Sequence, residues 1–325
     1  MSRSEIISES ASKVLVIGAT GYIGRYLVEA SVKLGHQTFA LVRPATANIA
    51  GAHGDDESKI NLIQSFQNAG VHVLFGDVND EEGLVAAMRK VDVVYSALGH
   101  HQCKLLQYQT LIIAAIKKAG NIKRFFPSEF GFDIERGQFL EPLKSVLAEK
   151  IKIREAVRKE GIPYTFVSSN FAATYFLSKL GQVEADGIPT ATVSILGDGN
   201  PKAVYVDEHD IATYSIKAAY DERTLNKTLY IRPLANIYST NELVSLWETK
   251  TNKTLKRIYV SEEEVLKKIN ESPVPLPFFY AVAYAGFIKG QMTNFDINPS
   301  IGVEASSLYP DVEYTTVEKY LDRFL

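Results

Sequence analysis

The stretch Lys13–Gly24, which reads KVLVIGATGYIG, decides the fold. Its first five residues form a short apolar run typical of a buried strand, and Tyr22–Leu34 continues with the spacing of an amphipathic helix. Gly18 and Gly21 lie between the two, and Gly24 lies in the first turn of the expected helix. These glycines let the backbone turn sharply and approach a pyrophosphate at the helix N-terminus. A glycine triplet alone is a weak signal, but at the first strand–loop–helix unit it indicates a dinucleotide site. The alternative interpretation is a tight turn without a ligand.

Short apolar strands and amphipathic helices alternate through the first half of the chain. After the first unit we expect strands at Thr38–Val42, His72–Phe75, Asp92–Tyr95, Arg124–Phe126 and Tyr164–Val167, and helices near Lys59–Ala69, Glu81–Met88, before Ala119 and near Ser145–Lys159. Four helices run into a glycine that would cap the C-terminus, namely Gly35, Gly70, Gly120 and Gly161. This pattern predicts an α/β fold with a doubly wound parallel sheet, the NAD(P)-binding Rossmann fold.

The pattern loosens after about Asn170. We expect strands at Thr192–Leu196, Ala203–Val206 and Leu229–Ile231, helices at Ile211–Tyr220, Thr240–Thr249 and Glu262–Ile269, a breaker at Ser272–Pro277 and an apolar stretch at Phe278–Ile288. The predicted organisation is a flexible tail over residues 1–12, an NADPH-binding domain over 13–172 and a smaller C-terminal α/β substrate lobe over 173–325. Some segments of that lobe are expected to return to the Rossmann sheet.

Composition excludes several classes of protein. Of the 325 residues, 46% are hydrophobic and 22% are charged, which excludes a disordered chain, and the net charge of −3 offers no basic surface for nucleic acid or anionic membranes. A single cysteine, Cys103, excludes a disulfide framework and a cysteine-built metal centre, and we expect no metal. No run approaches the ~20 apolar residues of a membrane span, and the polar N-terminus has no apolar leader core. We therefore expect a cytoplasmic protein.

Arg43 marks the end of the second expected strand, where NAD-specific sites usually place Asp or Glu to bind the ribose hydroxyls. A guanidinium at this position can instead form charge-assisted bonds to a 2′-phosphate. Lys59, at the start of the next helix, would supply a second positive charge. The alternative is that both are surface cations. We expect NADPH as the cofactor.

Hydride transfer needs a proton donor or acceptor, and Lys150 is the candidate. At ~100° per residue, Lys150 lies within about 60° of the apolar face of its helix, whereas Lys144, Lys152 and Lys159 point about 120° or more away. Apolar surroundings would lower the pKa of this amine towards that of a general base. A lysine at the edge of the core is an equal alternative on helix phase alone. The Tyr-x-x-x-Lys spacing at Tyr175 falls after the sixth strand and is interpreted as coincidental.

Six longer motifs make the chain resemble a known family. They are Gly18–Gly24, Asn121–Gly131, Glu141–Val146, Gly161–Thr165, Ile195–Asn200 and Glu304–Val312. The chain is similar to the plant isoflavone reductase group of NmrA-type atypical short-chain dehydrogenases/reductases, which includes phenylcoumaran benzylic ether reductases, pinoresinol–lariciresinol reductases and eugenol synthases. The resemblance runs from about Lys13 to Leu325, and it looks closest to phenylcoumaran benzylic ether reductase.

This resemblance implies an NADPH-dependent reductase of phenylpropanoid-derived phenols in lignan metabolism. Lys150 would take the para-phenol proton, a benzylic or allylic C–O bond would break, and the quinone methide would accept hydride. The implied cofactor contacts are Gly18, Thr20, Gly21, Tyr22, Ile23, Gly24, Arg43, Lys59, Ala97, Leu98, Gly99, His100, Pro127, Ser128, Glu129, Lys150, Asn170, Phe171 and Ala172. For the substrate we expect contacts from His100, Phe171, Tyr175 and Phe279.

Two departures from the family pattern leave the substrate open. Asn170-Phe171-Ala172 replaces the Asn-Cys-Phe of many relatives, and Cys103–Leu111 is longer than the family spacing. The alternatives are eugenol or isoeugenol synthase, pinoresinol–lariciresinol reductase and isoflavone reductase activity. From a different class, a non-catalytic NADP(H)-sensing regulator is an alternative, as is an epimerase or dehydratase. We expect a small phenolic substrate as partner, with a homodimer as the candidate assembly.

Overall fold

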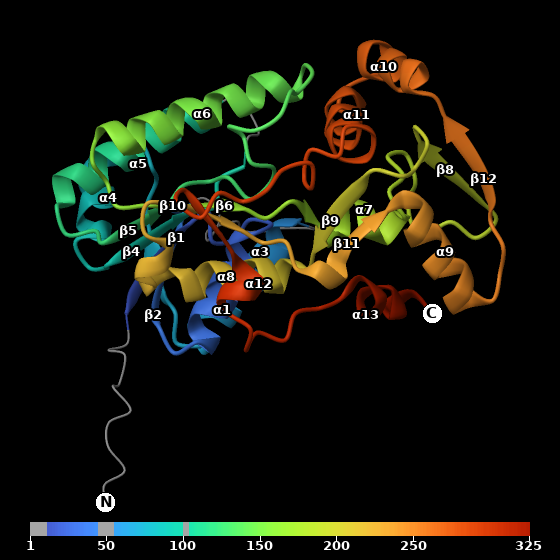
Figure 1. Cartoon of the computed structure of the whole chain (residues 1–325). Coiled ribbons are helices and arrows are strands. Elements are labelled where there is room, and N and C mark those ends of the chain that lie inside the picture. The colour runs from blue at the N-terminus through green and yellow to red at the C-terminus, as the bar shows by residue number, and fades with distance from the viewer. Residues whose placement is uncertain (1–11, 45–54, 100–103) are drawn as a thin grey trace, which may run out of the picture. The chain divides into compact units, whose positions relative to one another are not determined.

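The computed structural model describes residues 12–44, 55–99 and 104–325 (Figure 1). It divides into two compact units. The first unit contains the chain up to Ser128 with Lys152–Phe166 and Ser215–Lys227, and the second contains Glu129–Ile151, Val167–Tyr214 and Thr228–Leu325. The two units interleave along the sequence. The expected division at residue 172 concerns where cofactor and substrate bind, and it stays a prediction.

The first unit is built on a five-stranded parallel sheet in the order β3-β2-β1-β4-β5. Its strands are β1 (Lys13–Ile17), β2 (Gln37–Val42), β3 (His72–Phe75), β4 (Val93–Ser96) and β5 (Arg124–Phe126). The strand order reverses beside β1, which pairs with β2 on one edge and β4 on the other. This is the topological switch point at which doubly wound sheets bind their ligands, outside the carboxyl ends of the strands. The predicted fold class is confirmed.

Helices cover this sheet because each contributes an apolar face to the core. They are α1 (Gly24–Lys33), α3 (Asp55–Asn68), α4 (Glu81–Met88), α5 (Leu105–Ala119) and the last part of α6 (Leu143–Lys159), with α4 and α5 on the opposite face from α1 and α3 (Figure 1). The core joins strand residues such as Leu15 and Phe125 to helix residues such as Ile112 and Ile153. All four predicted capping glycines have positive φ, between 65° and 81°.

The rest of the chain forms smaller sheets and short helices. The strands are β6 (Thr165–Ser168), β10 (Lys227–Tyr230) and β13 (Gly302–Glu304) in one sheet, β7 (Phe171–Ala172), β9 (Lys202–Val206) and β11 (Ile237–Ser239) in another, and the parallel pair β8 (Thr192–Leu196) and β12 (Lys256–Val260). The helices are α7 (Ala173–Phe176), α8 (Glu208–Lys217), α9 (Thr240–Thr251), α10 (Glu262–Glu271), α11 (Leu276–Ala283), α12 (Ala305–Leu308) and α13 (Val317–Leu321). No helix within the described ranges is both long and apolar enough to cross a membrane.

The expected breaker Ser272–Pro277 is shorter in the structure. Leu276 and Pro277 already belong to the first turn of α11, where a proline costs no hydrogen bond because the amide would have no intrahelical partner. The apolar stretch that follows continues through α11 into a π-helix at Tyr284–Ile288. Such wide turns are uncommon and often occur at functional sites.

Candidate active site

The glycine loop after β1 leaves no room for side chains at two positions. A Cβ on Gly18, whose φ is +81°, would lie 2.8 Å from the carbonyl oxygen of Ala97. A Cβ on Gly24 would lie 2.0 Å from the carbonyl oxygen of Gly18. The amide of Gly21 donates to that same Gly18 oxygen at 2.9 Å, which closes the turn. The backbone can therefore approach a ligand as closely as a pyrophosphate requires.

The N-terminus of α1 suits an anion. Its N-cap residue, Ile23, makes no side-chain hydrogen bond to the helix, and its first turn contains no acidic residue. By contrast, Asp80 caps α4 by accepting from the amide of Gly83, and the first turn of α4 carries two glutamates. Because α1 offers amide donors and the positive end of its dipole without a competing carboxylate, the loop that includes Thr20 and Tyr22 fits a dinucleotide phosphate.

Arg43 follows the carboxyl end of β2 directly and is exposed. Lys59 lies in the second turn of α3 and is half-buried. Both belong to the first unit, and the position after β2 carries a cation where NAD-specific sites carry a carboxylate. These residues fit the 2′-phosphate of NADPH, and their contacts with it stay predictions.

Two further loops of the first unit are tied together by a buried glutamine. Gln109, on α5, is fully buried and donates from Nε2 to Ser96 Oγ at 2.5 Å. Its Oε1 accepts from the amide of Ser128 at 3.5 Å, and Ser128 Oγ donates to the carbonyl oxygen of Leu98 at 2.5 Å. Leu98 and Ser128, one from each predicted cofactor loop, are thus held in one network, whereas the predicted contact His100 lies outside the described residues.

Gln109 was not among the predicted site residues, although its position in the sequence carried a signal. It follows Leu105 by four residues and precedes Ile112 and Ile113 by three and four, so it occupies the apolar face of α5. A polar amide at such a position has to find buried partners.

Lys150 lies on α6 with the predicted phase. Its side chain is half-buried, while Lys144, Lys152 and Lys159 are exposed. Its Nζ donates to the backbone carbonyl oxygen of Glu129 at 2.7 Å, and both residues belong to the second unit. This hydrogen bond favours one position of the amine, at which the group can exchange a proton.

Within the second unit, the residues that follow Glu129 are hydrogen-bonded to the end of β6 and to Asn170. Phe130 and Asn170 both have positive φ, 45° and 60°. The carbonyl oxygen of Gly131 accepts from the Asn170 amide at 3.0 Å and from Ser168 Oγ at 3.2 Å. The Asn170 side chain donates to the Ile231 carbonyl oxygen at 2.9 Å.

Phe171 is buried in an aromatic cluster. Its ring is 4% exposed, and its centroid lies 4.5 Å from that of Phe176, 5.1 Å from Phe287 and 5.6 Å from Phe132. A Cβ on Gly286, in the π-helix, would lie 2.4 Å from Phe171 Cζ. The ring thus fills space beside the π-helix, and the predicted contacts of Phe171 and Ala172 with ligands stay predictions.

Tyr175 and Phe279, two predicted substrate contacts, are brought together by α7 and α11. Their ring centroids lie 6.5 Å apart, and 48% of Tyr175 is exposed. Burial of its hydroxyl raises the pKa of Tyr175, and the negative charge of Glu208 raises it further. Tyr175 therefore stays protonated at neutral pH, so its hydroxyl can donate a hydrogen bond, and its contact with a substrate stays a prediction.

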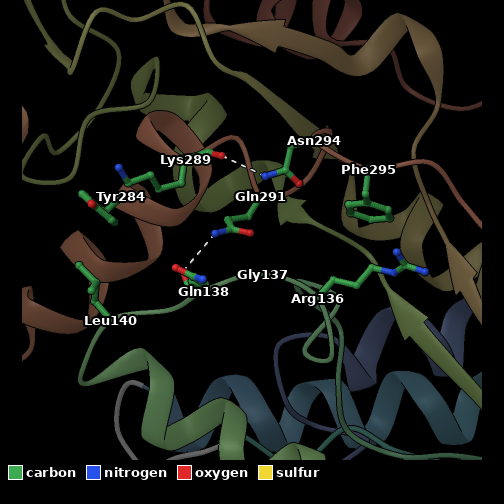
Figure 2. A pocket seen from close by; sticks show the side chains of 9 residues that line it. All are labelled: Arg136, Gly137, Gln138, Leu140, Tyr284, Lys289, Gln291, Asn294 and Phe295. Carbon is green, nitrogen blue, oxygen red and sulfur yellow. Dashed lines mark hydrogen bonds between the residues drawn. The ribbon is translucent and has the colours of Figure 1, made fainter.

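A pocket of about 490 Å³ opens in the second unit and contains none of the predicted site residues. It is lined by Arg136, Gly137, Gln138, Leu140, Tyr284, Lys289, Gln291, Asn294 and Phe295 (Figure 2). Gln291 points to Gln138 and donates to its carbonyl oxygen at 3.1 Å. The two cations of the pocket pair with carboxylates, Arg136 with Asp133 at 3.1 Å and Lys289 with Glu262 at 2.7 Å. The lysine of this pocket is thus paired with a carboxylate, whereas the amine of Lys150 donates to a backbone carbonyl oxygen.

Comparison with known proteins agrees with this arrangement. The chain is 55% identical over 316 residues to phenylcoumaran benzylic ether reductase Pyrc5 of Pyrus communis, covering 97% of this chain and 99% of that protein. It is also 55% identical over 313 residues to eugenol synthase 1 of Petunia hybrida, covering 96% and 98%. The solved structure of AtPrR2 with NADP+ and (+)-pinoresinol superposes with a TM-score of 0.90 at 38% identity, covering 97% and 99%.

These similarities extend over almost the whole chain, and a model of the NmrA-like family matches residues 10–321. The expected resemblance to reductases of the isoflavone reductase type is confirmed. The chain belongs to the NmrA-like family.

Proposed function

We propose that the protein is an NADPH-dependent reductase that cleaves a benzylic or allylic C–O bond of a phenylpropanoid-derived phenol, with Lys150 as the general base. The observation that carries this proposal is the half-buried amine of Lys150, held at 2.7 Å from the Glu129 carbonyl oxygen. Relatives of nearly full length are reductases of such phenols by name, and a related structure holds NADP+.

The residues of the first unit fit NADPH. The glycine loop and the uncapped N-terminus of α1 would hold the pyrophosphate, and Arg43 with Lys59 would hold the 2′-phosphate. When bound, this cofactor supplies the hydride that the substrate accepts. The loops at Ala97 and Ser128, tied by Gln109, would shape the rest of the cofactor site.

Lys150 performs the proton transfer. Its neutral amine takes the proton of the para-phenol, and the electron pair released into the ring expels the oxygen at the benzylic or allylic carbon. The substrate becomes a quinone methide, and hydride addition at that carbon restores the phenolate. Lys150 then returns its proton to the phenolate, and the departing oxygen takes the proton that the overall reaction consumes.

We assign a phenylcoumaran-like ether as the first-choice substrate. Equal identity to a benzylic ether reductase and to a eugenol synthase means that overall similarity does not select the C–O bond. Coniferyl esters, pinoresinol and isoflavones are the alternatives. Tyr175, through its protonated hydroxyl, and Phe279 are the residues proposed to contact the phenol. We also propose a cytoplasmic location and a homodimer.

The test is oxidation of NADPH in the presence of a phenylcoumaran, pinoresinol, an isoflavone or coniferyl acetate, with identification of each product. We expect the phenylcoumaran to be opened. Lys150→Ala should lower kcat by about 10²- to 10⁴-fold while NADPH binding is retained. Lys152→Ala, which removes an exposed lysine from the same helix, is the matched control and should leave kcat unchanged. NADPH binding with no turnover of any phenol would instead favour the alternative of a non-catalytic NADP(H)-sensing regulator.

A further inference from the structure

We propose that Asn170 is a positioning residue for Lys150, acting through the backbone of Glu129–Gly131 rather than through contact with a ligand. This inference rests on the proposed role of Lys150 as general base. All residues involved belong to the second unit.

The amine of Lys150 depends on a backbone acceptor for its position. A lysine side chain has four rotatable bonds and loses much conformational freedom when it is held in one place. The hydrogen bond from Nζ to the Glu129 carbonyl oxygen, at 2.7 Å, favours one position of the amine. The direction of that carbonyl therefore affects where the amine lies.

The direction of the Glu129 carbonyl is coupled to an unfavourable backbone conformation. The peptide plane that contains this oxygen ends at Phe130, whose φ is +45°. A bulky side chain rarely adopts positive φ, and such a residue persists only where its surroundings hold it. The segment needs anchors on its far side to keep the carbonyl turned towards α6.

The anchors come from the end of β6 and the residues that follow it. The Gly131 carbonyl oxygen accepts two hydrogen bonds, from the Asn170 amide at 3.0 Å and from Ser168 Oγ at 3.2 Å. Both donors are buried, Ser168 at 1% and Asn170 at 7% exposure. Water therefore competes little for these bonds, and the peptide beyond Phe130 is held in place.

Asn170 can supply its amide because its own backbone is left-handed, with φ of +60°. Asparagine tolerates this conformation better than other side chains with a Cβ. Its Nδ2 also donates to the Ile231 carbonyl oxygen at 2.9 Å, and the Ile231 amide donates to the Ser168 carbonyl oxygen at 2.9 Å. The side-chain amide is thus used to brace the backbone that reaches Gly131.

The decisive experiment compares substitutions at Asn170 with a matched substitution elsewhere. Asn170→Ala strains the backbone and removes the side-chain amide. Asn170→Gly also removes the side-chain amide but keeps the backbone free to adopt positive φ. Asn252→Ala is the control, since Asn252 has φ of +51° at the exposed C-terminus of α9. For each variant, kcat, KM, the Kd of NADPH and Tm are measured, with wild type and Lys150→Ala as references.

We expect Asn170→Ala to lower kcat by about 30-fold, with KM and the NADPH Kd within about twofold of wild type, because a misplaced group loses rate rather than ligand binding. Asn170→Gly should recover much of the lost kcat. Asn252→Ala should lower Tm through the strain of its positive φ alone, without changing kcat. Ser168→Ala, which removes one bond to Gly131 and leaves φ unaffected, should lower kcat by about threefold.

Three outcomes would overturn the proposal. Equal kcat values for Asn170→Ala and Asn252→Ala would mean that Asn170 contributes only to folding. A weakened NADPH Kd with full kcat at saturating cofactor would make Asn170 a cofactor contact instead. If Asn170→Ala does not fold, unchanged kcat in both Ser168→Ala and Asn170→Gly rejects the proposal. Lys150→Ala with wild-type kcat would instead show that the proposed function itself is wrong.

Discussion

The loop after β1 and the loop after β5 both follow the carboxyl end of a parallel strand and both contain a left-handed residue, yet they are stabilised differently. In the loop after β1, Gly18 adopts its positive φ without strain and is bonded by Gly21, three residues away. In the loop after β5, Phe130 is held through Gly131 by Ser168, 37 residues further along the chain. The first loop depends on the absence of side chains at Gly18 and Gly24, and the second depends on distant partners. The first loop is therefore disrupted by substitutions within it, whereas the second can be disrupted by substitutions far away in the sequence.

The largest effect should come from adding one methyl group to the first loop. Gly24→Ala places a Cβ 2.0 Å from the Gly18 carbonyl oxygen, so the loop has to open. We expect the Kd of NADPH to rise by about 100-fold or more, although alanine is otherwise the better helix former by about 1 kcal/mol. Titration of protein fluorescence with NADPH measures this. Gly187→Ala, which meets nothing within 4 Å, is the control, and equal affinity in both variants would show that the loop is not locally constrained.

Arg43 tests whether the first unit selects NADPH by charge at one position. Removing a charge-assisted bond to the 2′-phosphate costs about 2 kcal/mol, so Arg43→Ala should weaken NADPH by about 30-fold and leave NADH unchanged. Calorimetric Kd values for both cofactors check this. Arg89→Ala removes another exposed arginine, at the C-terminus of α4, and should change neither value. Equal loss for NADPH and NADH would exclude phosphate recognition by Arg43.

The two loops that Gln109 connects are a contrasting case, because these loops of the first unit depend on buried side-chain hydrogen bonds. Gln109→Leu keeps the apolar packing of α5 but leaves Ser96 Oγ and the Ser128 amide without their partner. We expect about a tenfold loss of NADPH affinity, since each unsatisfied buried group costs about 1–3 kcal/mol. Gln67→Leu, at an exposed position of α3, is the control for introducing a leucine. Unchanged affinity in Gln109→Leu would mean that the network does not shape the cofactor site.

The smallest effect concerns a long-range contact in the second unit. Asp210 accepts from the Thr315 amide at 2.7 Å, yet burial raises its pKa to about 6. Because the folded state holds this proton more tightly than the unfolded state, the contribution of Asp210 to stability falls as pH rises from about 4 to 6. Between pH 5.5 and 7.0, where the last part of this loss falls, wild type should lose about 1 kcal/mol of unfolding free energy relative to Asp210→Asn.

Urea unfolding at the two pH values measures this difference. Asp186→Asn, at an exposed aspartate, is the control and should follow wild type. A difference between wild type and Asp210→Asn that stays constant with pH would show that Asp210 does not titrate in this range.

Much of the first unit, and the orientation of α6 in the second, could be predicted from short-range patterns. Strand and helix periodicity places Lys150 on the buried side of α6, and the requirement for a turn without side chains places Gly18 and Gly24. Both depend on residues a few positions apart. The same reasoning placed Arg43 at the end of β2, because the strand end is marked by the end of an apolar run, and its cofactor contact stays a prediction.

The supports of Lys150 could not be predicted in this way. Nothing in the sequence near Glu129 indicates that Ser168 and Asn170 bond to Gly131, because those contacts exist only once β6 is in place. The π-helix at Tyr284–Ile288 could not be predicted either, since its apolar sequence is equally compatible with an ordinary α-helix. Phe171 was expected at a ligand, and its burial depends on packing partners as distant as Phe287.

The contact between Phe171 and Gly286 makes these two positions epistatic. With Phe171 present, any larger residue at 286 would meet the ring, since even a Cβ would lie 2.4 Å from it. With a smaller residue at 171, the same change at 286 would fill the space that the ring vacates. A directed-evolution library that varies either position alone would therefore discard combinations that are fit together. Changing the packing between Phe171 and the π-helix requires a paired library, in which the codons for residues 171 and 286 are randomised in the same clone.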